Sequence, residues 1–153
     1  MNDNRLTQEI IAPVVKTVIV NLPLGAAFRL FTAEINRWWP LESHSVFGDE
    51  AAACSMDCKT GGRIIEQHKD GRETEWGTVL AWEPPNRLVF SMYPGRSADT
   101  ATEVEVAFEA YPMGGTRVTL THRGWENYGG WKLRENYNTG WDTVLGKYTQ
   151  AAA

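Results

Sequence analysis

Cysteine is scarce in this sequence, with two residues in 153. Cys54 and Cys58 are separated by three residues, which is not the C-x-x-C spacing typical of redox and zinc sites. On one strand their Cα atoms would lie about 13 Å apart, whereas a disulfide requires a separation below about 7 Å. We therefore expect two small buried side chains in a reducing compartment, and we predict a cytoplasmic location.

Basic runs and long apolar runs are also missing. The net charge is −4, and lysine and arginine are scattered singly along the chain. Such a surface repels phosphate and anionic lipid, so we expect no nucleic-acid partner and no membrane association. No apolar stretch approaches the roughly 20 residues that span a bilayer. The polar residues 1–9 lack the apolar core of a signal peptide, so the sequence predicts no export.

Motifs for catalysis or cofactor binding are absent as well. The sequence contains no G-x-S-x-G, no dinucleotide-binding G-x-G-x-x-G and no Walker sequence. Its three histidines, His44, His68 and His122, form no i, i+4 pair. The sequence therefore predicts no metal site, no cofactor and no recognisable catalytic residues.

The composition is that of one globular domain. Hydrophobic residues make up 42% of the chain and charged residues 22%, which excludes disorder away from the ends. There are no repeats and no linker. We predict a single domain at residues 10–150 that follows a flexible N-terminus, residues 1–9.

The hydrophobic pattern divides the chain into a series of short elements. β-Branched residues dominate residues 10–20 and predict a first strand. Helical spacing in residues 24–39 predicts two short helices with a corner near residues 32–34, and Pro40 should end the second. Turn residues then separate about six consecutive strands. These are expected at residues 51–58, 63–68, 73–82, 87–93, 102–110 and 116–123.

The clearest strand pattern lies in residues 102–110, where apolar and acidic side chains alternate. This alternation is expected of an antiparallel strand with one face in water. Residues 116–123 should pair with it and place Arg117 and Arg123 opposite the acidic face. The same register directs His122 to the inner face.

From residue 125 to the end the apolar spacing is helical, and one stripe runs along the predicted helix. The stripe consists of Leu133, Tyr137, Trp141, Val144 and Tyr148. A long twisted sheet curls, and this helix fits its concave face. The sequence thus predicts an α+β fold in which a curved antiparallel sheet of six to seven strands surrounds a long C-terminal helix.

Several short motifs occur in a fixed order along the chain. They are Asn36-Arg37-Trp38-Trp39-Pro40, Gly61-Gly62-Arg63, Gly77-Thr78-Val79-Leu80, Glu83-Pro84-Pro85-Asn86-Arg87-Leu88-Val89-Phe90, Gly115-Thr116-Arg117-Val118-Thr119-Leu120-Thr121-His122 and Gly140-Trp141. This ordered set resembles the activator-of-Hsp90-ATPase-like (AHSA1-like) branch of the START/Bet v 1 (SRPBCC) superfamily. The resemblance implies a helix-grip fold with an internal hydrophobic pocket. It implies no catalytic residues, because such domains include lipid carriers, hormone receptors, polyketide cyclases and a co-chaperone domain.

Seven tryptophans are many for this length, and they fit either core packing or an aromatic-lined pocket. Trp76 and Trp82 share one face of their predicted strand with Leu80, and Trp141 lies on the helix stripe that should face them. The residues expected to line the ligand pocket are Trp38, Trp39, Trp76, Trp82, Phe90, Phe108, His122, Tyr137 and Trp141.

Three polar side chains each have two interpretations. His122 is either a neutral core histidine or a group that orients a ligand or transfers a proton. Glu66 shares a face with Ile64 and His68 and requires a partner if that face is buried; no spacing brings it to His122. His44 lies in a loop and is either exposed or gates the pocket.

Three functions remain open from the sequence. The preferred one is the binding of a small hydrophobic or aromatic molecule between the sheet and the C-terminal helix. The second is an enzyme of the polyketide cyclase or dehydratase type, with His122 or Glu66 as the acid or base. The third is a chaperone-regulator-like interaction module that docks through the acidic strand 102–110. A protein partner thus stays possible, as do a monomer and a homodimer.

Overall fold

The computed structural model describes residues 10–153, and the predicted flexible N-terminus, residues 1–9, lies outside them. The described chain begins with strand β1, helix α1 and a short 3-10 helix, continues with six further strands and ends with the long helix α2. The bounds are β1 Val14–Val20, α1 Leu24–Phe31, η2 Ile35–Arg37, η3 Gly48–Glu50, β2 Ala51–Met56, β3 Arg63–His68, β4 Glu73–Glu83, β5 Arg87–Met92, η4 Ala98–Thr100, β6 Thr102–Tyr111, η5 Pro112–Gly114, β7 Gly115–Arg123 and α2 Gly130–Ala151.

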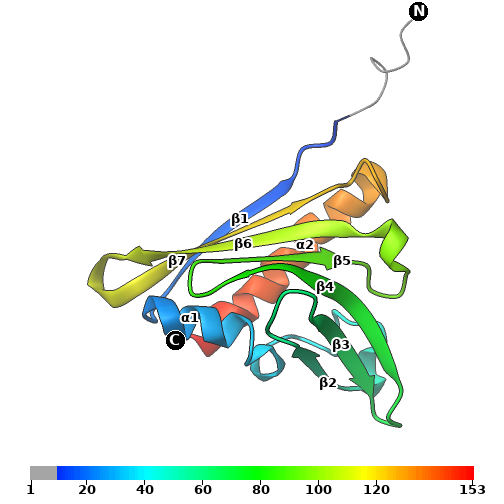
Figure 1. The fold of residues 1–153 in the computed structure, drawn as a ribbon, viewed down its shortest axis with the longest axis horizontal. Helices are drawn as coiled ribbons and strands as arrows, with labels where there is room; N and C mark the ends of the chain where they lie inside the picture. The colour runs from blue at the N-terminus through cyan, green and yellow to red at the C-terminus, as the bar shows by residue number, and fades with distance from the viewer. Residues whose placement is uncertain (1–9) are drawn as a thin grey trace, which may run out of the picture.

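These strands form one seven-stranded antiparallel sheet in the order β1-β7-β6-β5-β4-β3-β2. From β2 to β7 each strand pairs with its neighbour in sequence, and β1 pairs with β7. The sheet curls, and α2 lies along its concave side (Figure 1). This arrangement confirms the predicted α+β helix-grip fold. Within residues 10–153, no helix has the length and apolar character required to cross a bilayer.

Helix α1 fills one end of the space between the sheet and α2. The rings of Phe28 and Phe31 contact Phe108 of β6, with centroid separations of 5.0 and 5.9 Å. The Tyr148 hydroxyl of α2 donates a hydrogen bond to the Ala27 carbonyl at 2.8 Å. Figure 1 shows the C-terminal end of α2 beside α1. Side chains therefore occupy this part of the concave face.

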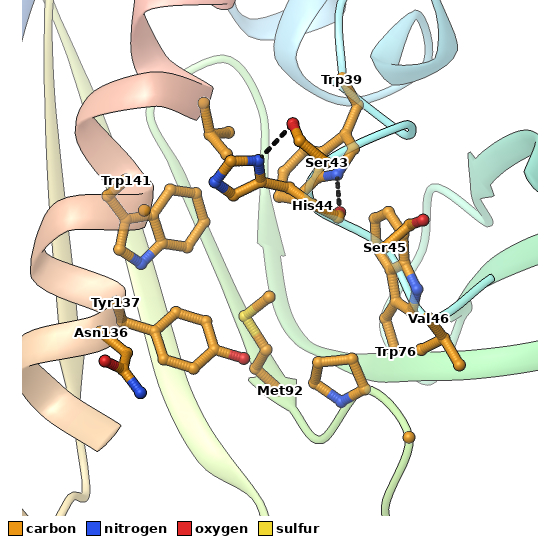
Figure 2. A pocket seen from close by; sticks show the side chains of 14 residues that line it. Trp39, Ser43, His44, Ser45, Val46, Trp76, Met92, Asn136, Tyr137 and Trp141 are labelled. Atoms are coloured by element: carbon orange, nitrogen blue, oxygen red, sulfur yellow. Dashed lines mark hydrogen bonds between the residues drawn. The ribbon is translucent and has the colours of Figure 1, made fainter. Parts of the chain in front are cut away.

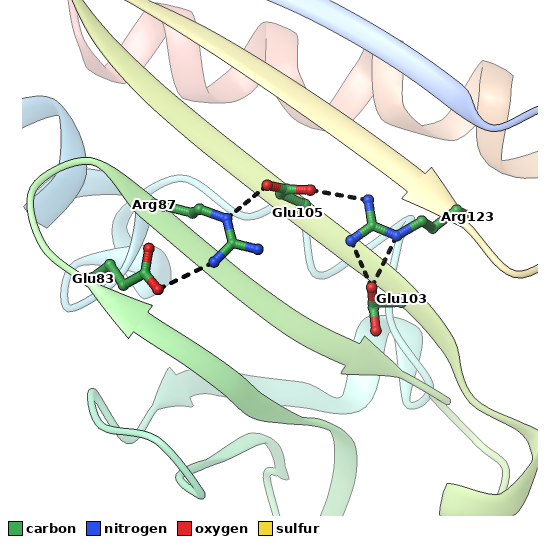
Figure 3. A network of polar contacts seen from close by, with 5 residues as sticks. All are labelled: Glu83, Arg87, Glu103, Glu105 and Arg123. Atoms are coloured by element: carbon green, nitrogen blue, oxygen red, sulfur yellow. Dashed lines mark hydrogen bonds and ion pairs between the residues drawn. The ribbon is translucent and has the colours of Figure 1, made fainter.

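The outer face of the sheet carries a ladder of ion pairs (Figure 3). Arg87 of β5 contacts Glu83 at 3.2 Å and Glu105 at 2.7 Å. Arg123 of β7 contacts Glu103 at 2.6 Å and Glu105 at 3.0 Å. The predicted pairing of arginines on β7 with the acidic face of β6 is thus confirmed. Because these side chains are partly exposed, solvent screens the pairs and each contributes little to stability.

Four predicted boundaries differ from the structure by two residues or more, and several others differ by one. Strand β1 begins at Val14 instead of residue 10, and the second predicted helix is a single 3-10 turn that ends before Trp38. Strand β2 ends at Met56, so Cys58 lies in the next turn; both cysteines are free thiols. Helix α2 begins at Gly130 instead of residue 125, because Gly129 has a φ of 86°, in the left-handed region that interrupts a helix.

Strand β4 departs from the expected alternation because it contains two β-bulges. Trp76 is the extra residue opposite Ile64 and Ile65 of β3, and Leu80 is the extra residue opposite β5. Each bulge moves the following residues to the other face. Leu80 is consequently 47% exposed, whereas Trp76 and Val79 are buried. The prediction that Leu80 shares an inner face with the strand's two tryptophans is therefore wrong.

We predict that Gly77 is required for this bend in β4. A Cβ at residue 77 would lie 1.8 Å from the carbonyl oxygen of Ser91, a backbone atom that cannot yield. Gly77→Ala is expected to lower the free energy of unfolding by about 1–3 kcal/mol. Gly25→Ala in α1, where a Cβ meets nothing within 4 Å, is the matched control. Equal urea midpoints for the two variants would contradict the prediction.

Candidate ligand-binding cavity

A cavity of about 440 Å³ lies between α2, the sheet and the loop of residues 41–47 (Figure 2). Its volume is within the range of roughly 300–1,000 Å³ that is usual for small-molecule sites. The lining residues are Trp39, Ser43, His44, Ser45, Val46, Trp76, Met92, Pro94, Gly95, Asn136, Tyr137, Gly140, Trp141 and Val144. None of these described residues carries the charged side chain of an Asp, Glu, Lys or Arg.

Four of the nine residues expected at a ligand pocket line this cavity. They are Trp39, Trp76, Tyr137 and Trp141. Trp39 contacts Trp76 with ring centroids 4.9 Å apart, and it meets Trp141 edge-on at 5.9 Å with an interplanar angle of 88°. Three tryptophans from the loop after η2, from β4 and from α2 thus meet around one space.

The other five residues lie elsewhere, mainly because α1 occupies part of the concave face. Phe108 packs under α1, and Trp38 contacts Tyr148 with a centroid separation of 5.1 Å. Trp82 packs edge-on against Phe28 and borders a separate surface depression. Phe90 is buried in the core, and His122 lies behind Trp141.

Each indole N–H at the cavity is already bound to an acceptor of the protein. Trp39 donates to the His44 carbonyl at 2.7 Å, and Trp76 donates to Glu66 Oε1 at 2.7 Å. Trp141 donates to His122 Nδ1 at 3.0 Å. Burying an N–H group without a partner lowers the stability of the fold. These three bonds remove that cost for an aromatic cavity wall. The indoles therefore offer ring carbons, and no free N–H, to a bound molecule.

Glu66 is fully buried and fastens the loop that forms one cavity wall. Its carboxylate accepts hydrogen bonds from the backbone N–H groups of Val46 and Phe47, both at 2.8 Å, as well as from Trp76. The alternation of β3 did not decide whether the Glu66 side chain points inward. In the structure it points inward and accepts hydrogen bonds from three N–H groups. Glu66 is not among the residues that line the cavity.

His122 is buried and fixes the orientation of Trp141. Because the indole N–H can only donate, His122 Nδ1 must be the unprotonated nitrogen. Its Nε2 therefore carries the proton and donates to Thr102 Oγ1 at 2.7 Å. Burial lowers the pKa of His122 to about 3. Of the two interpretations of His122, the structure favours the neutral core histidine.

The sequence offered two interpretations of His44, exposed or at the pocket, and it did not point to Ser43 and Ser45, which the same loop brings to the cavity. The imidazole of His44 lines it, with Nδ1 2.7 Å from the Ser43 hydroxyl. The ring lies against helix α2, where a Cβ on Gly140 would be 3.6 Å away. Loops have no periodicity, and the one available signal was the position of His44 just after the Trp-Trp-Pro corner.

Comparisons with known proteins agree with the fold described above. A family model described as "Activator of Hsp90 ATPase homolog 1-like protein" matches residues 21–152. The chain belongs to this family. The predicted AHSA1-like membership within the SRPBCC superfamily is therefore confirmed. Among curated proteins, none matches the chain.

Solved structures similar to this AHSA1-like chain include proteins with different descriptions. The anthrahydroquino-gamma-pyrone synthase Txn09 complexed with SUM is 29% identical, with a TM-score of 0.65 over 92% of this chain and 97% of that one. The self-sacrificing resistance protein CalC from Micromonospora echinospora is 22% identical, with a TM-score of 0.65 over 92% and 94%. An AHSA1-like protein from Aeromonas hydrophila is 23% identical, with a TM-score of 0.60 over 89% and 90%. The last two share the fold.

We predict that His122 makes stability depend on pH. Its folded-state pKa of about 3 lies below the ordinary 6.5, so between these values the unfolded chain binds more protons. Its contribution to stability is fully present above about pH 6.5 and is lost as the pH falls toward 3. Urea unfolding between about pH 7 and pH 4.5 should show a steeper decline for the wild type than for His122→Gln. Equal slopes would contradict this.

Proposed function

We propose that this AHSA1-like domain binds a small aromatic or hydrophobic molecule in the cavity between α2, the sheet and loop 41–47. The observation that carries the proposal is the group of three tryptophans whose N–H groups are all bound within the protein. Such a wall binds through ring faces and excludes water without leaving a polar group unpaired. The similarity to Txn09, which was solved in complex with SUM, supports a ligand-binding role for this fold.

Filling the cavity from helix α2 tests the proposal. Gly140 lines the cavity, and a Cβ there makes only ordinary contacts with His44, at 3.6 and 3.7 Å. The longer side chain of Gly140→Leu should therefore enter the cavity. We expect the affinity for diphenylmethane, measured by calorimetry, to fall about tenfold or more, which corresponds to about 1.4 kcal/mol.

Gly146→Leu provides the matched control on the same helix, because a Cβ there meets nothing within 4 Å. Both changes replace glycine in a helix and should raise helix stability by up to about 1 kcal/mol. Only Gly140→Leu should weaken binding. Equal affinities for the two variants, or no binding of diphenylmethane to the wild type, would overturn the proposal.

A second candidate function is catalysis on such a molecule, and one contact favours it. The Ser43 hydroxyl lies 2.7 Å from His44 Nδ1; when this nitrogen carries the proton, Nε2 is free to accept one from a ligand. The acid/base candidates from sequence, His122 and Glu66, have their hydrogen-bonding atoms occupied by protein donors and acceptors.

A protein-interaction role stays a prediction, which a pull-down tests.

For the catalytic candidate, the prediction concerns turnover of a molecule that co-purifies with the chain. Loss of a general base typically costs about 100-fold or more, so His44→Gln should reduce turnover by that amount. His68→Gln is the control, because His68 does not line the cavity. Chromatography of the molecule over time measures both rates, and an unchanged rate in His44→Gln would rule this role out.

A further inference from the structure

The Tyr137 side chain packs against two aromatic neighbours at the cavity. Its ring meets His122 edge-on with a centroid separation of 4.8 Å, and it lies 5.5 Å from the ring of Trp125. His122 is in turn fixed by Thr102 and Trp141. Figure 2 shows the Tyr137 hydroxyl pointing into the cavity, toward Met92. The direction of this hydroxyl is therefore set by packing.

Among the described residues, no partner binds the Tyr137 hydroxyl, and at the cavity it shares this state with His44 Nε2 and the Asn136 side chain. The indole N–H groups are all occupied, and Ser45 Oγ donates to the Leu41 carbonyl and accepts from the Gly48 N–H. The exposed Asn136 lies at the rim. By contrast, the buried Tyr148 hydroxyl is bound to the Ala27 carbonyl.

The chemistry of this hydroxyl limits what it can bind. Burial raises the pKa of Tyr137, so the phenol stays protonated and is available as a donor. The surrounding side chains are mainly aromatic or aliphatic, and none of the described lining residues is an Asp, Glu, Lys or Arg. Arg96, whose charge acts on Tyr137, already donates to the carbonyls of Met92 and Thr100. An ionised ligand group would therefore be desolvated without an oppositely charged side chain in the lining, which is unfavourable. A neutral acceptor oxygen avoids this cost.

We propose that Tyr137 selects aromatic ligands that carry a neutral acceptor oxygen, such as an aryl ketone, by donating its hydroxyl to that oxygen. The inference rests on the proposed binding function. It adds the chemical class of the ligand and the residue that recognises this class. A site built around a hydrogen bond discriminates against an analogue that lacks the matching group, because the site's own polar group then stays unpaired.

Benzophenone and diphenylmethane test this selection, because they differ only by a carbonyl in place of a methylene. Calorimetry with wild type and Tyr137→Phe gives four affinities. Benzophenone is expected to lose about 3- to 10-fold in affinity on the substitution, as one net hydrogen bond implies, and diphenylmethane less than about 2-fold. Tyr148→Phe, which removes a hydroxyl outside the cavity, should change neither affinity.

The carbonyl stretch of isotope-labelled benzophenone gives a second readout that packing alone would not move. It should shift to lower frequency on binding to the wild type and not on binding to Tyr137→Phe. If both ligands lose affinity equally in Tyr137→Phe, or the stretch is the same in both proteins, the selection by Tyr137 is refuted while the binding function stands. If neither ligand binds the wild type, both proposals fall.

Discussion

The hydrogen bond from the Trp141 indole to His122 fixes the wall of the cavity that helix α2 contributes. It forms because His122 is neutral, with Nδ1 free to accept and Nε2–H directed to Thr102. His122 also packs against the ring of Tyr137, so one buried imidazole sets the position of two cavity residues on α2. A protonated imidazole could accept no hydrogen bond, and Trp141 would then lose its partner.

The opposite wall depends on a second buried polar group in the same way. Glu66 binds the N–H groups of Val46 and Phe47 together with the Trp76 indole, so it joins the loop to β4. His122 thus accepts the indole N–H of Trp141, and Glu66 accepts that of Trp76. In both cases the ring of the tryptophan still faces the cavity. The two bulges of β4 shape this wall, since Trp76 and Leu80 are the extra residues and Trp76 is buried while Leu80 is exposed.

Much of the fold follows from local patterns in the sequence. Alternation in β6, turn residues between the strands and the helical stripe of α2 together specify a meander that closes around a helix. Strand β4 was the exception, since a bulge depends on contacts with both neighbouring strands and leaves no signature in a period of two. The glycine at residue 77 is the one local sign, because the close approach of Ser91 leaves no room for a side chain.

The candidate site was less predictable than the fold. Aromatic residues on an inner face can pack against α1 or face the cavity, and sequence spacing does not distinguish Phe108 from Trp76. The helix stripe did identify Tyr137 and Trp141, because residues spaced by three and four along α2 share one face. Ser43 and His44 reach the cavity through a loop whose path is set by long-range bonds to Glu66, which no local pattern records.

The indole N–H signals of the seven tryptophans offer the most direct test of the account. In two-dimensional ¹⁵N–¹H spectra, assigned by single Trp→Phe substitutions, addition of diphenylmethane should shift the signals of Trp39, Trp76 and Trp141 through ring currents. Their slow exchange with solvent should persist, because their acceptors belong to the protein and not to the ligand. Shifts confined to other tryptophans, or rapid exchange of these three, would contradict the account.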